Sequence, residues 1–247
     1  MCCFSGPVDR VAETNIFARE SRKGHQFIVY SMTLETSADV AMILPLPVPV
    51  GSGEKAVTFI NLEEYNGFFA DAHRGFPRPR SKSATDLRAV RPSEQQLEVV
   101  SVGSFEASFV PTVADFARLD KRFRLPDGTF EKLPGYRDWG FAVFKLKKGK
   151  KKIHPMALEM PTRWPKKLFF PTVHIHDGKI HSKAKFDHSL YAQAAVDEGK
   201  NLARWTESPD LAAKFMQIKK AKGIVSGTEH LYWKRVFGSR ENTDITV

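Results

Sequence analysis

The strongest turn signal in the chain is the pair Asp177 and Gly178, which divides the run 169–188 into two segments of alternating character. A two-residue type I′ turn needs positive φ at both central positions, and Asp-Gly tolerates this well. The sequence therefore predicts a β-hairpin at this point. A two-residue loop also fixes the register of the two strands, and it sets His174 directly opposite His181.

Three histidines share one face of this predicted hairpin. Successive side chains on a strand alternate between faces, so His174 and His176 lie on the same face as the cross-strand partner His181. Opposed Cβ atoms lie about 5 Å apart, which lets imidazole nitrogens share one metal ion at about 2.1 Å. We therefore predict a zinc or copper site at these three residues. The alternative is a hairpin whose polar face is simply exposed to water.

The two cysteines, Cys2 and Cys3, are adjacent, so they cannot form a disulfide framework between distant parts of the chain. Removal of Met1 would leave a free amine beside the Cys2 thiol, and such a cysteine can act as a nucleophile with its own amine as base. The alternative function is thus an N-terminal-nucleophile amidohydrolase with Cys2 as the catalytic residue. If the N-terminal segment folds over the histidine face, a thiolate, which we assign to Cys3, would instead complete the metal site.

Basic residues give the chain a net charge of +10 and would attract anionic partners. The densest cluster is 145–152, with six lysines in eight positions, and the run 77–91 is rich in arginine. A second alternative function is therefore a non-enzymatic module that binds nucleic acid. The lysine cluster lacks the aromatic residues on which bases stack, so a solvated strand edge protected by lysine explains it better.

The secondary structure expected from the sequence is mixed. Residues 14–20 and 25–35 read as a hairpin around S-R-K-G, and 40–50 as a strand that ends in a proline-rich segment. Capping residues and apolar spacing predict helices at 61–72, 112–123, 189–205 and 208–223. Because strands and helices follow no regular βαβ order, we predict an α+β fold with mostly antiparallel sheet, several hairpins and about four helices.

The length of 247 residues and a hydrophobic content of 42% are sufficient for one domain with a substantial core, so we predict a single domain over 1–247. The run 77–96 is rich in Pro, Arg and Ser and has no periodicity. We expect it to be a long mobile loop, and it could mark a boundary between two halves.

No stretch of the chain has the length and apolar character of a membrane span, and the first residues do not resemble a signal peptide. The H-E-x-x-H, C-x-x-C, G-x-S-x-G and G-x-G-x-x-G patterns are absent. We therefore predict a cytoplasmic protein with no membrane partner, which binds a transition metal and uses it for hydrolytic or redox chemistry on a small molecule that no motif identifies.

Overall fold

Residues 10–36 form the long hairpin that the sequence predicts around S-R-K-G. The structure is a computed structural model that describes residues 2–76, 101–102, 105–119, 121, 124, 134–175, 181–194 and 202–247. The two strands, β2 (Arg10–Arg22) and β3 (His25–Thr36), pair antiparallel along most of their length. The turn between them requires a left-handed residue, and Gly24 supplies it with a φ of 74°.

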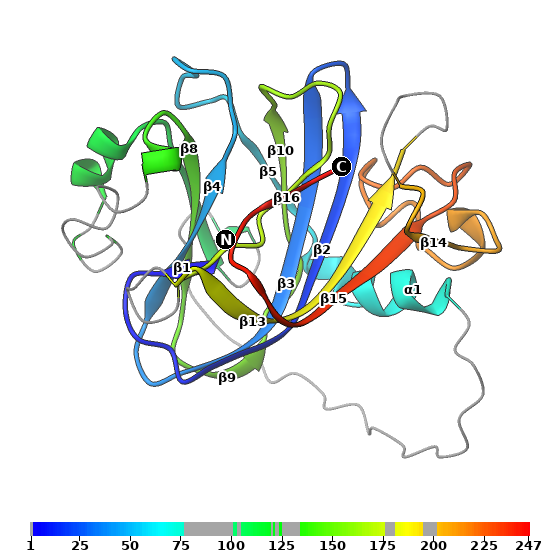
Figure 1. Cartoon of the computed structure of the whole chain (residues 1–247), viewed down its shortest axis with the longest axis horizontal. Coiled ribbons are helices and arrows are strands. Elements are labelled where there is room, and N and C mark those ends of the chain that lie inside the picture. The colour runs from blue at the N-terminus through cyan, green and yellow to red at the C-terminus, as the bar shows by residue number, and fades with distance from the viewer. Residues whose placement is uncertain are drawn as a thin grey trace.

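This hairpin forms the centre of the larger of two main sheets, whose strand order is β14-β15-β13-β2-β3-β10-β5, with β9 also paired to β3 (Figure 1). The other strands are β5 (Thr58–Asn61), β9 (Gly149–Lys152), β10 (Met156–Pro161), β13 (Lys183–Gln193), β14 (Thr206–Glu207) and β15 (Tyr232–Glu241). Within the described residues, β13 and β2 run parallel, and the other neighbours in this sheet are antiparallel.

The second main sheet has the order β12-β1-β4-β8-β7-β6 and brings the N-terminal strand beside a segment from the last third of the chain. Its strands are β1 (Cys2–Phe4), β4 (Val40–Leu46), β6 (Ser101–Val102), β7 (Phe105–Val110), β8 (Gly140–Leu146) and β12 (His174–Ile175). A short pair, β11 (Phe169–Phe170) with β16 (Ile245–Thr246), fixes the C-terminal residues.

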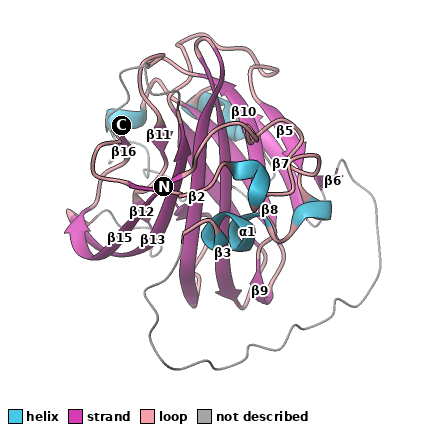
Figure 2. Cartoon of the chain, turned by 90° about the vertical axis from the view of Figure 1, so that its right-hand side faces the viewer, coloured by secondary structure: helices cyan, strands magenta, loops and turns pink. Residues whose placement is uncertain are grey.

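Alternation along the central strands produces two hydrophobic cores, one on each face of the larger sheet. Ile16 and Ala18 of β2 belong to the core between the two main sheets, whereas Phe17 belongs to the core on the opposite face. That second core is covered by the segment 62–76 and by parts of 212–231. The molecule is therefore built of two sheet layers and a third layer of short helices and loops (Figures 1 and 2).

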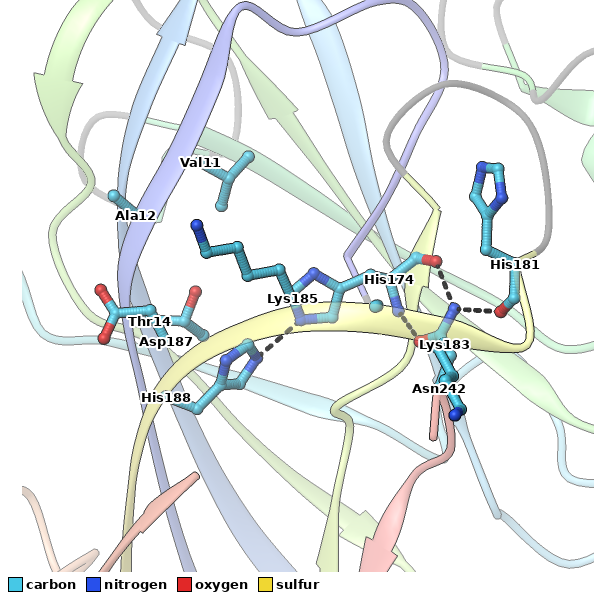
Figure 3. Close-up of a pocket in the computed structure, with 11 residues that line it drawn as sticks. Val11, Ala12, Thr14, His174, His181, Lys183, Lys185, Asp187, His188 and Asn242 are labelled. Atoms are coloured by element: carbon cyan, nitrogen blue, oxygen red, sulfur yellow. Dashed lines mark hydrogen bonds between the residues drawn. The ribbon is translucent and has the colours of Figure 1, made fainter. Parts of the chain in front are cut away.

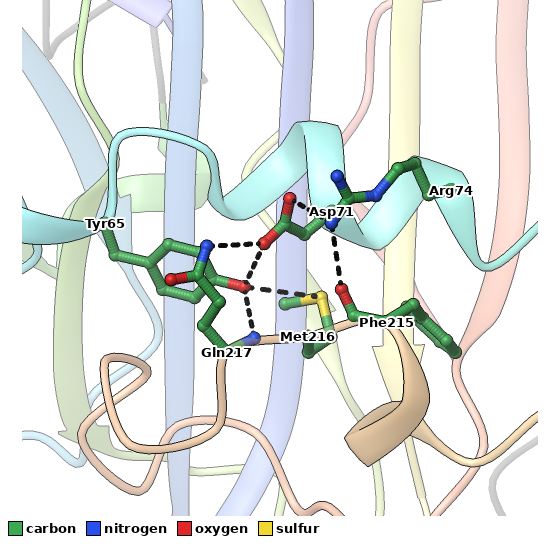
Figure 4. A network of polar contacts seen from close by, with 6 residues as sticks. All are labelled: Tyr65, Asp71, Arg74, Phe215, Met216 and Gln217. Atoms are coloured by element: carbon green, nitrogen blue, oxygen red, sulfur yellow. Dashed lines mark hydrogen bonds and ion pairs between the residues drawn. The ribbon is translucent and has the colours of Figure 1, made fainter.

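The third layer is held together by the carboxylate of Asp71, which is only 4% exposed. Asp71 lies in α1 (Phe68–Arg74), which follows the short 3-10 helix η1 (Glu63–Tyr65). One of its oxygens accepts hydrogen bonds from the Tyr65 hydroxyl at 2.9 Å and from the Gln217 amide at 3.1 Å, and the other forms an ion pair with Arg74 at 2.8 Å (Figure 4). The carboxylate thereby joins α1 to a segment more than a hundred residues later.

The predicted α+β class with about four helices is wrong, because the part of the chain that the structure describes is mostly β, with 46% strand and 12% helical conformation. Within the described residues α1 is the one α-helix. The predicted helix 61–72 contains η1 and part of α1. In the described parts of 112–123 and 208–223 the helical conformation is 3-10 rather than α, with η2 (Val113–Arg118) in the first range and η5 (Ala212–Lys214) in the second. A further 3-10 helix, η4, spans Pro134–Tyr136.

The predicted helix 189–205 begins instead as the second half of β13, for a reason that lies in tertiary packing. Leu190 and Ala192 enter the core between the sheets, and Tyr191 enters the core on the other face. A central strand buried on both faces shows no alternation of polar and apolar residues, and so its sequence resembles that of a buried helix.

The predicted loop and the expected lack of a membrane span can be compared with the structure only within the described residues. The expected loop 77–96 lies outside the described residues. In the part of the chain that is described, no helix is long and apolar enough to cross a membrane.

Candidate functional site

The segments on either side of the predicted turn belong to different sheets and do not pair with each other in the described residues. β12 runs parallel to β1, whereas β13 lies between β2 and β15. The ladder partner of His174 is Cys2 rather than the predicted His181. His176 and the turn itself lie outside the described residues. The predicted register is therefore wrong for His174 and His181.

The imidazole that His174 meets is that of His188, a residue of β13. β13 turns His188 inward, where it is 2% exposed, and its Nε2 atom lies 3.2 Å from the Nε2 atom of His174 (Figure 3). The ring of Phe186 packs against both imidazoles, with centroid distances of 4.6 Å and 5.2 Å. Two neutral rings can form this hydrogen bond when one carries its proton on Nε2 and the other on Nδ1.

Asn242 fixes the main chain on both sides of the 176–180 segment. Its side-chain oxygen accepts a hydrogen bond from the His174 N–H at 2.8 Å, and its amide donates to the His174 carbonyl at 2.9 Å and to the His181 carbonyl at 3.0 Å. Its own N–H donates to the Ser182 carbonyl at 2.9 Å. The carboxamide thus satisfies the backbone of His174 as a neighbouring strand would, which holds the imidazole in place.

Asp244 fixes the residues just before β12. Its carboxylate accepts hydrogen bonds from the backbone N–H groups of Thr172 at 2.8 Å and Val173 at 3.0 Å, and from the Tyr136 hydroxyl at 2.7 Å. Burial raises the pKa of Tyr136 above its ordinary value, and the negative charge of Asp244 raises it further. The sequence 241–247 looks like a polar tail, yet it holds β12 and, through it, His174.

A cavity of about 380 Å³ lies beside the histidine pair, where β2 and β13 separate (Figure 3). The two strands pair only from Thr14 and His188 onward. Just before this point β2 has an irregularity between Ala12 and Asn15, with Glu13 in the left-handed region at a φ of 53°. A bulge of this kind bends a strand and increases its twist, which opens the sheet at this place.

Titratable groups border this cavity on several sides. They are His174, His181, Lys183, Lys185, Asp187 and His188. Asp187 is 3.4 Å from Arg235, so its charge is partly compensated. No group of three or more His, Cys, Asp or Glu side chains in the described residues is arranged to hold a metal ion.

Both cysteines belong to β1. Cys3 is fully buried in the core between the main sheets and pairs with Ile43 of β4 and Ile175 of β12. The backbone of Cys2 lies beside that of His174, so the N-terminal segment does reach the histidine region. The catalytic role of Cys2 and the metal-binding roles of Cys3 and His176 stay predictions.

The lysine cluster 145–152 lies where the chain passes from one main sheet to the other. β8 ends at Leu146 in the smaller sheet, and β9 starts at Gly149 in the larger one. Lys145 forms an ion pair with Glu106 at 2.7 Å, and Lys150 lies 3.3 Å from Glu35. At least two of the lysines therefore have an ion-pair partner in the fold, and nucleic-acid binding by the cluster stays a prediction.

No protein-family model and no curated protein matches this chain. Among solved structures, the chain is similar to baculovirus P35, with a TM-score of 0.54 and 13% identity over 99% of this chain and 98% of that one. It is also similar to a mutated baculovirus P35 after caspase cleavage, with a TM-score of 0.52 and 14% identity over 95% of this chain and 98% of that one. At this identity the likeness establishes the fold alone.

Proposed function

We propose that this chain is a protein inhibitor of caspase-type cysteine proteases that is itself cut by its target. The observation that carries the proposal is a likeness to baculovirus P35 that extends over nearly the full length of both chains, together with a similar structure of P35 obtained after caspase cleavage. A fold alone does not determine function, so the support must also come from what this chain would do when it is cut.

A cut between residues 77 and 100 would leave the described fold joined by non-covalent contacts. β2, β3 and β4 precede this stretch, and they pair with β13, β10 and β8, which follow it. Both hydrophobic cores also combine residues from the two sides. An inhibitor that is cut must remain folded to stay bound to the protease, whereas an ordinary substrate separates into fragments. The interlocked sheets favour the first behaviour.

The stretch between Phe76 and Ser101 contains a single aspartate, Asp86. Caspases cut the bond that follows an aspartate, because a pocket of the enzyme selects this side chain. The composition of 77–96 predicts an exposed loop, and exposed loops are the preferred sites of proteolysis. We therefore expect cleavage between Asp86 and Leu87, which both lie outside the described residues.

Incubation of the full chain with a panel of purified caspases tests this expectation. At least one enzyme should convert the chain into fragments 1–86 and 87–247, identified by intact mass, and the fragments should elute together on size exclusion. Asp86→Ala should stay intact because the pocket that accepts aspartate would no longer be filled. Asp210→Ala removes an exposed aspartate from a described loop, and this control should be cut like the wild type.

Resistance of the wild-type chain to every caspase would contradict the proposal. Cleavage of Asp86→Ala at the wild-type rate would show that the bond after Asp86 is not the target.

A further inference from the structure

The distance between the two imidazole nitrogens in the cavity matches a shared metal ion as well as a hydrogen bond. Two nitrogens bound to one zinc ion at about 2.1 Å lie about 3.4 Å apart at the tetrahedral angle and about 3.0 Å apart at a right angle. The Nε2 atoms of His174 and His188 are 3.2 Å apart, between these two values. Both rings therefore need little movement to bind the same ion.

We propose that His174 and His188 together bind a zinc or copper ion through their Nε2 atoms, with water from the adjoining cavity in the remaining positions. This site replaces the predicted set of His174, His176 and His181, because the structure brings His188 to His174 and leaves His181 outside the pair. The inference is independent of protease binding and goes beyond it.

The two ligands are held in place by separate parts of the fold. The backbone of His174 is fixed by its pairing with β1 and by the carboxamide of Asn242. His188 belongs to β13, which is paired on both sides, and its ring packs against Phe186. Because both side chains are already ordered, binding an ion loses little conformational entropy, which favours affinity.

The cavity leaves room for water molecules as further ligands of the ion. Its volume of about 380 Å³ can hold several water molecules, so an ion at the histidine pair would keep open positions. Lys183 and Lys185 also border the cavity, but both are exposed, and water and salt screen their charge. Asp187, whose charge Arg235 partly compensates, also borders the cavity.

Binding requires only a change of tautomer at one ring. In the hydrogen-bonded pair one neutral imidazole carries its proton on Nε2. That proton moves to Nδ1 when the ion binds, so each Nε2 lone pair faces the metal and each ring keeps one N–H. Two neutral histidines therefore accept the ion without a net release of protons.

Titration of the protein, prepared without a histidine tag, with Zn²⁺ and with Cu²⁺ at pH 7.5 tests the site by calorimetry and by the melting temperature. We expect saturable binding and a higher melting temperature in the wild type. His174→Ala and His188→Ala should each weaken binding by at least about tenfold, since each removes a ligand. His181→Ala removes an exposed imidazole from the same cavity, and this matched control should bind as the wild type does.

A spectroscopic measurement on the wild-type chain keeps the test decisive if a variant fails to fold. The electron paramagnetic resonance spectrum of bound Cu²⁺ should contain splitting from two imidazole nitrogens. Absence of binding in the wild type, a copper spectrum without nitrogen splitting, or binding that survives in both single variants would overturn the proposal. Loss of binding in His181→Ala at unchanged affinity of His188→Ala would do so as well.

Discussion

Replacement of Asp71 by alanine should lower the free energy of unfolding by about 3 kcal/mol, because it removes the acceptor on which a buried network depends. The Tyr65 hydroxyl is enclosed in the core between α1 and the segment 215–217, and Asp71 accepts its hydrogen bond at 2.9 Å (Figure 4). The same carboxylate oxygen binds the Gln217 amide. Without it, the hydroxyl proton would have only the Met216 sulfur, 3.9 Å away, as an acceptor, and α1 would lose its polar link to the segment 215–217.

Urea unfolding of three variants separates the parts of this effect. Asp71→Asn keeps an oxygen acceptor but loses the charge, so its loss of stability should be smaller than that of Asp71→Ala. Arg74→Ala removes an ion-pair partner whose side chain is 66% exposed, and the cost should be below about 1 kcal/mol. An equal loss of stability in Asp71→Ala and Arg74→Ala would contradict a central role of the Asp71 carboxylate in this network.

Above pH 10 the protein should lose stability steeply, because two fully enclosed tyrosines resist ionisation in the folded state. Burial raises the pKa of both Tyr65 and Tyr191 above the ordinary value of 10.0, and each residue is 1% exposed. As the pH rises through 10, these tyrosines lose their protons in the unfolded chain and keep them in the folded one. The unfolded state then binds fewer protons, so the free energy of unfolding falls by about 1.4 kcal/mol per pH unit for each tyrosine.

Urea unfolding between pH 9 and pH 11 measures this slope. The lysines also titrate in this range, so the comparison with Tyr191→Phe is the informative one. That variant should lose the share of one tyrosine, about 1.4 kcal/mol per pH unit. Identical slopes for the variant and the wild type would show that Tyr191 ionises as readily in the folded chain as in the unfolded one.

Two local signals in the sequence predicted local structure correctly. The β2–β3 hairpin follows from S-R-K-G between two β-rich runs, and Asn61 marks the start of a helical turn, where its side chain accepts a hydrogen bond from the Glu63 N–H at 2.8 Å. Both features depend on residues within a few positions of each other.

Long-range packing decided the elements that the sequence did not predict. The helices expected at 189–205 and 208–223 contain residues with reasonable helix propensity, but propensity is a weak preference that tertiary contacts override. β13 gains more from its ladders with β2 and β15 than a helix would gain there, since it buries apolar side chains on both faces. Parallel partners that lie far apart in sequence leave no local pattern.

The sequence predicted only part of the candidate site, again because long-range packing assembles it. The cluster of histidines predicted a site at 174–181, and His174 does lie at the candidate site. Its partner His188 and its support Asn242 lie 14 and 68 residues away, and the Asp-Gly turn argued for a different partner. Asn242 has no signature in the sequence, because a carboxamide that satisfies a distant backbone looks like any other polar residue.

Inhibition of a caspase by the chain that it cuts is tested most directly by titration of a purified caspase with the full chain. Enzyme activity on a small fluorogenic peptide should fall in proportion to the chain added, and the enzyme should elute together with both fragments. Asp86→Ala should leave the activity unchanged, whereas Asp210→Ala should inhibit as the wild type does. A caspase that cuts the chain and keeps its full activity, or one that neither cuts nor binds it, would contradict the claim.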